Sequence, residues 1–81
     1  MDKATIINFI TTTMIELLPE LEGTEIDPKV SFSDYGLNSI DRADLIIQTV
    51  EEHQIQASMI EFAGATSADD LAEKILTLGG A

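Results

Sequence analysis

The 81-residue chain contains no cysteine, one histidine, and only four basic side chains. Without cysteine, a disulfide framework and a thiolate zinc site are both excluded. No apolar run is long enough to span a bilayer, and the start, MDKATIINFI, lacks the basic flank and the cleavage site of a signal peptide. We therefore expect a cytoplasmic protein that does not insert into membranes.

Acidic side chains dominate the charge of the chain. Fifteen acidic residues against four basic ones give a formal net charge of −11. Such a surface repels nucleic acid and anionic membranes and attracts basic partners, although acidity could also serve solubility alone. Because 44% of the residues are apolar, the sequence predicts a folded domain over residues 1–81 rather than a disordered acidic tail.

Helical periodicity is present in the first segment of the chain. Apolar residues recur there at three- and four-residue steps, namely Ile6, Ile10, Met14, Leu17 and Leu21, with Ile7 and Leu18 widening the stripe. Pro19 either ends this helix or leaves it one irregular turn. Residues 22–38 predict a long loop that apolar side chains pin to the core, namely Ile26, Val30, Phe32, Tyr35 and Leu37.

A second helix is predicted from Ser39 to His53. Asn38 is a good N-cap, and the carboxylate of Asp41 favours the positive end of the helix. One arc of the helical wheel holds most of its apolar residues, namely Ile40, Ala43, Ile46, Ile47 and Val50. Leu45 lies off this arc, so the helix has apolar residues for both a core and an outside contact.

Two further helices are predicted near the end of the chain. Ser58 and Glu61 have the spacing of a capping box, so a short helix carrying Ile60 and Phe62 should begin there and stop at Gly64. Ser67 should cap a last helix that ends at Gly79-Gly80 and buries Leu71, Ile75 and Leu78. The predicted fold class is all-α: a small four-helix bundle of three main helices and one short helix, with a long loop between the first and second helices.

Catalytic and metal-binding constellations are not found in the sequence. His53 lies fourteen residues after Ser39 in the same predicted helix. That separation is roughly 20 Å along the axis, so His53 cannot serve Ser39 as a base and is better read as a surface or boundary residue. No acidic pair has the spacing of a calcium loop, so we expect no dedicated metal site.

Ser39 has two interpretations. A serine near a helix start commonly accepts a hydrogen bond from a free backbone amide, but Asn38 is already placed to do this. A hydroxyl at the positive end of a helix, just after a glycine, is alternatively a suitable acceptor of a phosphate ester.

The stretch from Asp34 to Asp41, DYGLNSID, resembles the attachment motif of acyl carrier and peptidyl carrier proteins. The resemblance extends to the length, the acidity, the long first loop, the short third helix and the last helix that begins near TSADDL. It implies a non-catalytic carrier rather than an enzyme. A phosphopantetheinyl transferase would move 4′-phosphopantetheine from coenzyme A to the Ser39 hydroxyl, and acyl groups would then be carried as thioesters on the arm.

The same resemblance implies that the second helix recognises partner enzymes. The residues expected to contact them are Ile40, Asp41, Arg42, Ala43, Asp44, Ile47 and Glu51. Ala43 and Ile47 could equally face the core, since a helical wheel does not distinguish inside from outside. Acyltransferases, ketosynthases or enzymes resembling 3-hydroxy-3-methylglutaryl-CoA (HMG-CoA) synthase would bind through basic docking surfaces, and we expect the carrier itself to be a monomer.

At two positions the sequence departs from the usual family pattern, and these positions resemble those of one subclass of carriers. Asn38 replaces the commoner aspartate, and Arg42 places a cation where the helix is usually acidic; Arg42 would either form an intrahelical ion pair or discriminate between partners. The run NSIDRAD is similar to stand-alone donor carriers of polyketide β-branching cassettes, which deliver an acetyl unit to an HMG-CoA synthase-like enzyme.

Other functions remain open from the sequence alone. Fatty-acid or nonribosomal peptide carriers share the attachment motif. An acidic helical adaptor that binds a basic partner without being modified is a further alternative, and its binding would be sensitive to salt. A small hydrolase that uses Ser39 lacks a nearby base.

Overall fold

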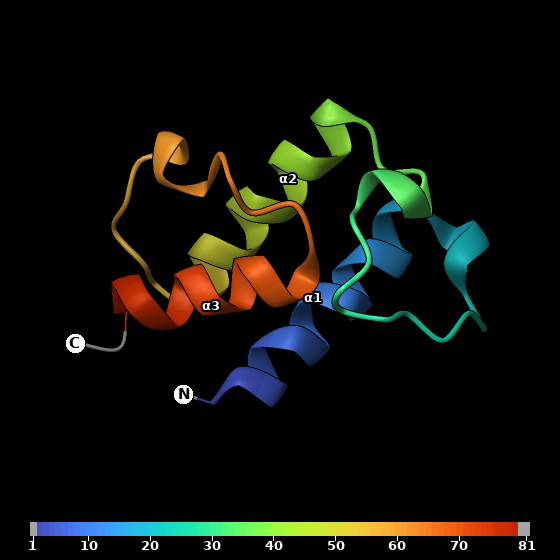
Figure 1. The fold of residues 1–81 in the computed structure, drawn as a ribbon, viewed down its shortest axis with the longest axis horizontal. Helices are drawn as coiled ribbons and strands as arrows, with labels where there is room; N and C mark the ends of the chain where they lie inside the picture. The colour runs from blue at the N-terminus through green and yellow to red at the C-terminus, as the bar shows by residue number, and fades with distance from the viewer. Residues whose placement is uncertain (1, 80–81) are drawn as a thin grey trace.

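The computed structural model describes residues 2–79 and contains three α-helices and three short 3₁₀ helices (Figure 1). In chain order they are α1 (Lys3–Leu17), η1 (Pro19–Leu21), η2 (Ser33–Tyr35), α2 (Ser39–Glu52), η3 (Met59–Phe62) and α3 (Ala68–Gly79). No strand occurs in this described part of the chain, where one isolated antiparallel bridge joins Ser31 to Ser67. The predicted all-α class is confirmed, with the short helix realised as a 3₁₀ turn.

Asp2 caps the start of helix α1, and Pro19 follows shortly after its end. The Thr5 amide donates to the Asp2 carboxylate at 2.8 Å, and this hydrogen bond lowers the pKa of Asp2. Three predicted apolar side chains are buried along the helix, namely Ile6, Ile10 and Met14. Pro19, which lacks an amide N–H, starts the separate turn η1, whose Leu21 is also buried. Both interpretations of Pro19 therefore hold: the α-helix stops and one irregular turn follows.

Four of the predicted side chains pin the loop between α1 and α2 to the core, namely Phe32, Leu37, Ile26 and Tyr35. Phe32 and Leu37 are buried, whereas Ile26, Val30 and Tyr35 are half-buried. The loop is also joined to the start of α3 through backbone hydrogen bonds: Phe32 N–H donates to Thr66 O at 2.7 Å, and Asp69 N–H donates to Pro28 O at 2.8 Å. These bonds fix the segment that leads into α2.

The buried side of α2 differs from the predicted arc. Leu45, which lay off that arc, is completely buried together with Ile46 and Thr49, whereas Ile40 is 79% exposed and Ile47 is 45% exposed. Thr49 can occupy the core because its hydroxyl donates to the Leu45 carbonyl at 2.8 Å. The helix thus has apolar residues on both a buried and an exposed side, as predicted, and Leu45 and Ile46 are the ones that face the core.

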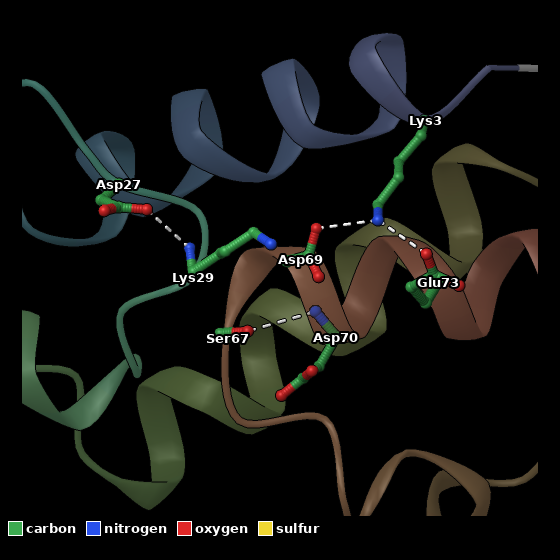
Figure 2. A network of polar contacts seen from close by, with 7 residues as sticks. All are labelled: Lys3, Asp27, Lys29, Ser67, Asp69, Asp70 and Glu73. Carbon is green, nitrogen blue, oxygen red and sulfur yellow. Dashed lines mark hydrogen bonds and ion pairs between the residues drawn. The ribbon is translucent and has the colours of Figure 1, made fainter.

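The last two helices are confirmed in part. The predicted capping box at Ser58 is wrong, because its side chain makes no cap hydrogen bond and η3 is a single 3₁₀ turn. Phe62 is buried, but Ile60 is 79% exposed. The cap of α3 is confirmed, since Asp70 N–H donates to Ser67 Oγ at 3.1 Å (Figure 2).

Helix α3 supplies the predicted stripe to the core. Leu71 and Ile75 are buried and Leu78 is half-buried. The helix runs through Gly79, and the predicted stop at Gly80 lies outside the described residues.

Lys3 joins α1 to α3 across the bundle. Its ammonium lies 2.8 Å from the Asp69 carboxylate and 2.6 Å from that of Glu73 (Figure 2). The hydrogen bonds raise the pKa of Lys3, and the bond from Lys3 lowers the pKa of Asp69, with nearby Lys29 adding a weaker Coulombic effect.

Among residues 2–79, no helix is both long enough and apolar enough to cross a membrane.

Candidate functional site

Ser39 is the first residue of α2 and its side chain is exposed. The preceding residue, Asn38, has an extended backbone and caps the helix: Asp41 N–H donates to Asn38 Oδ1 at 2.8 Å. In return, Asn38 N–H donates to Asp41 Oδ2 at 3.4 Å, which completes a capping box. Because Asn38 performs the capping, the Ser39 hydroxyl is free for other chemistry.

Gly36 shapes the approach to this helix. It follows η2 with φ of +98°, in the left-handed region that side chains with a Cβ rarely adopt. The turn directs Leu37 into the core, and Leu37 N–H donates to Phe32 O at 3.1 Å. The glycine and the leucine of the motif therefore hold Asn38 and Ser39 in place at the surface.

A shallow cleft of about 130 Å³ opens beside Ser39. It is lined by Ser33, Leu37, Asn38, Ser39, Arg42 and Thr66. None of these side chains is a carboxylate or an imidazole, so the cleft offers an exposed hydroxyl without a general base. Its chemistry suits a hydroxyl that an outside enzyme modifies.

His53 lies at the opposite end of α2 as its C-cap residue. Its Nδ1 is 2.8 Å from the Thr49 carbonyl oxygen, and its ring meets that of Phe9 edge-on with centroids 5.5 Å apart. His53 is half-buried, as its interpretation as a boundary residue requires.

The predicted partner-facing residues of α2 differ in exposure. Ile40, Asp44, Ile47 and Glu51 are exposed, and Ala43 is half-buried at the margin between core and surface. Asp41 is half-buried because its carboxylate takes part in the capping box. The part that these residues play in partner binding stays a prediction.

Arg42 forms a contact that the sequence did not indicate. Its Nη2 donates to the Ala63 carbonyl oxygen at 3.2 Å, which connects α2 to the end of η3. The intrahelical ion pair, one of the two alternatives for Arg42, is not among the ion pairs of residues 2–79, which all involve Lys3. Arg42 as a whole residue is half-buried, and it lines the cleft.

Two exposed apolar side chains on η3 were not predicted as surface residues. Met59 is 43% exposed and Ile60 is 79% exposed. A four-residue turn is too short for periodicity to separate its buried side from its exposed side, so the only sequence signal of exposure was the position of these two residues beside Glu61.

Within residues 2–79, no three acidic or histidine side chains converge on a position suited to a metal ion.

Comparison with known proteins gives three concordant similarities. Residues 8–75 match the family model described as the phosphopantetheine attachment site. The chain is 34% identical over 73 residues to the polyketide biosynthesis acyl-carrier-protein AcpK of Bacillus subtilis (strain 168), an alignment that covers 90% of this chain and 89% of that protein. The fold matches a chain in the crystal structure of the curacin biosynthetic pathway HMG synthase in complex with acetyl donor-ACP. The TM-score is 0.89 at 30% sequence identity, covering 95% of this chain and 99% of that chain.

Proposed function

The chain belongs to the phosphopantetheine attachment family, and from this premise we propose that Ser39 carries the 4′-phosphopantetheine arm of an acyl carrier protein of polyketide biosynthesis. The observation that carries the assignment is the exposed Ser39 hydroxyl at the start of α2, left free by the Asn38 cap. The surroundings fit the group, because a cleft with an arginine and without carboxylates opens beside this hydroxyl.

Loading requires a second enzyme, which we propose to be a phosphopantetheinyl transferase. The Ser39 Oγ forms a bond to the phosphorus atom that bears the pantetheine in coenzyme A. The pyrophosphate bond of coenzyme A breaks, adenosine 3′,5′-bisphosphate leaves with the electron pair, and the hydroxyl proton passes to a base of the transferase. The cleft needs no base of its own for this step, in agreement with its lining. When attached, the arm supplies a terminal thiol that holds an acyl group as a thioester.

Mass spectrometry tests the attachment directly. After incubation with coenzyme A and a permissive transferase, the protein should gain the mass of one phosphopantetheinyl group, and Ser39→Ala should gain none. Ser33→Ala is the matched control, because Ser33 is also exposed and lines the same cleft. Loading of Ser39→Ala, or unchanged mass of the wild type with several transferases, would refute the assignment.

We further propose that this carrier delivers an acetyl unit to an HMG synthase-like enzyme. The support is the likeness to a structure that contains an acetyl donor-ACP with such an enzyme. The docking surface would comprise exposed and half-buried apolar residues of α2 surrounded by carboxylates and one cation, namely Ile40, Ala43, Ile47, Asp41, Asp44, Glu51 and Arg42. Charges at the rim of such a surface accelerate association with a basic partner more than they increase affinity.

The docking proposal is tested by matched pairs of charge variants. Asp44→Gln with Glu51→Gln should slow acetyl delivery to an HMG synthase-like enzyme by about tenfold at low salt, and less at high salt. Glu16→Gln with Glu20→Gln removes the same charge from exposed positions on α1 and η1 and should leave the rate near that of the wild type. Equal effects of the two pairs would show that only net charge matters. Faster delivery to a fatty-acid ketosynthase than to the HMG synthase-like enzyme would favour the alternative carrier class.

A further inference from the structure

Arg42 is the only basic residue of α2, and its side chain lines the cleft beside Ser39. In a chain with four basic and fifteen acidic residues, a cation at this position is not expected from composition. The other three basic residues are Lys3, Lys29 and Lys74, which lie on α1, on the long loop and on α3. Within residues 2–79, Arg42 is therefore the one basic residue that lines the cleft beside the attachment serine.

The guanidinium of Arg42 is restrained but keeps its charge uncompensated. Its Nη2 donates to the neutral Ala63 carbonyl oxygen at 3.2 Å. No carboxylate within residues 2–79 forms an ion pair with it. A guanidinium has five N–H donors, and the bond to Ala63 uses one of them. The remaining donors are available to an anion in the cleft, which no carboxylate lines.

The spacing of the two residues places such an anion within reach. Ser39 and Arg42 are three positions apart on α2, so their Cβ atoms lie about 5–6 Å from each other on the same side of the helix. Both line the same cleft of about 130 Å³. A phosphate ester on the Ser39 hydroxyl would thus begin beside the guanidinium.

We propose that the Arg42 guanidinium binds the phosphodiester at the root of the arm, an inference that rests on Ser39 as the attachment residue. The planar guanidinium can donate two parallel N–H bonds to the oxygens of a phosphodiester, which a lysine ammonium cannot reproduce. The bond to Ala63 already restricts the side chain, so less conformational freedom is lost on binding. The root of the arm is thereby directed along the seam between α2 and η3.

Phosphorus NMR of the loaded protein tests this contact without any measurement of activity. In the folded wild type, the phosphodiester ³¹P resonance should be shifted from its position in the urea-unfolded protein. Arg42→Gln should move the resonance most of the way to the unfolded position, and Arg42→Lys should give an intermediate value. The Arg42 Nε–H resonance should also shift between the unmodified and the loaded wild type.

Lys74→Gln is the matched control, because it removes the same charge from α3, outside this cleft. Its ³¹P resonance should equal that of the wild type. If Arg42→Gln changes the amide resonances of η3 but not the ³¹P resonance, Arg42 only positions η3 and the proposal is overturned. An equal ³¹P change in Lys74→Gln would overturn it as well, because it would reveal a net-charge effect.

The two proposals fail in different ways. If the wild-type protein gains no phosphopantetheinyl mass, or if Ser39→Ala gains it, mass spectrometry refutes the assignment of Ser39 as the attachment residue. If Ser39 is loaded but neither the ³¹P nor the Arg42 Nε–H resonance responds as described, only the phosphate contact fails.

Discussion

Asn38 and Asp41 satisfy each other's backbone amides at the start of α2, through bonds of 2.8 Å and 3.4 Å. The family pattern usually has aspartate at the position of Asn38. An asparagine side-chain oxygen accepts the same hydrogen bond, so the substitution preserves the cap while removing one charge beside Ser39. This relationship fixes where the helix begins and hence where the hydroxyl is presented.

Removal of the cap should weaken the whole domain. Asn38→Ala should lower the free energy of unfolding by about 1 kcal/mol, because the Asp41 amide loses its acceptor. Asn38→Asp, which keeps an acceptor of equal rank, should stay within about 0.5 kcal/mol of the wild type. Urea denaturation followed by circular dichroism measures both, and equal losses in the two variants would contradict the assigned cap.

Gly36 should resist substitution because of its backbone conformation and not for lack of space. A Cβ built there would lie 3.7 Å from Leu18 Cδ1, an ordinary contact, but the φ of +98° is unfavourable for alanine. Gly36→Ala should therefore cost about 1 kcal/mol of unfolding free energy, the strain being partly offset by reduced freedom of the unfolded chain.

Gly64→Ala is the natural comparison for Gly36→Ala. Nothing lies within 4 Å of its added Cβ, and its φ is outside the left-handed region. We expect this variant to be neutral or slightly more stable than the wild type. A larger loss in Gly64→Ala than in Gly36→Ala, measured by thermal unfolding, would contradict the argument.

The contribution of Lys3 should depend on pH in both directions. The pKa of Asp69 is lowered, so its share of the stabilisation is complete above the ordinary value of 3.8 and is lost as pH falls through the lowered value. The pKa of Lys3 is raised, so its share is complete below 10.5 and is lost as pH rises through the raised value. The stability difference between wild type and Lys3→Gln should be a plateau between these limits.

The comparison of variants is necessary because acid also relieves repulsion among the fifteen acidic residues. Lys74→Gln removes the same charge from a residue that forms no ion pair within residues 2–79. Its stability difference should lack the dependence tied to Asp69. Identical pH profiles for the two variants would show that overall charge, and not the Lys3 contacts, determines the effect.

Two neighbouring apolar residues of η3 should respond oppositely to truncation. Phe62 is 1% exposed, so Phe62→Ala should cost about 3–5 kcal/mol and remove much of the stability of so small a domain. Ile60 is 79% exposed, so Ile60→Ser should change stability by about 0.5 kcal/mol or less. Urea denaturation distinguishes them, and a loss above about 2 kcal/mol for Ile60→Ser would mean that its side chain is buried.

The features that the sequence predicted correctly are mostly those set by residues close together in the chain. The caps at Asn38 and Ser67 depend on residues three positions apart, and both are present in the structure. The motif around Gly36 and Ser39 likewise lies within one short segment. Such features are readable because the chemistry and the geometry are close in the chain.

Long-range features were not accessible in the same way. The orientation of α2 depends on which side meets α1, so the helical wheel could not decide whether Ile47 faces the core or the surface, where it is 45% exposed. The hydrogen bond from Arg42 to Ala63 spans 21 positions and has a backbone carbonyl as its acceptor. A pattern of side chains in the sequence cannot predict such a bond. For Ser58, the spacing matched a capping box, but a single 3₁₀ turn formed without the side-chain bond.

The loop before α2 is fastened to the segment before α3 by main-chain atoms of Phe32, Thr66, Asp69 and Pro28. Main-chain bonds survive replacement of most side chains, so the exposed positions between these anchors can be exchanged without moving Ser39. Lys29, which is exposed between Pro28 and Phe32, is such a position. The loop therefore offers a surface position whose charge can change while the serine keeps its place.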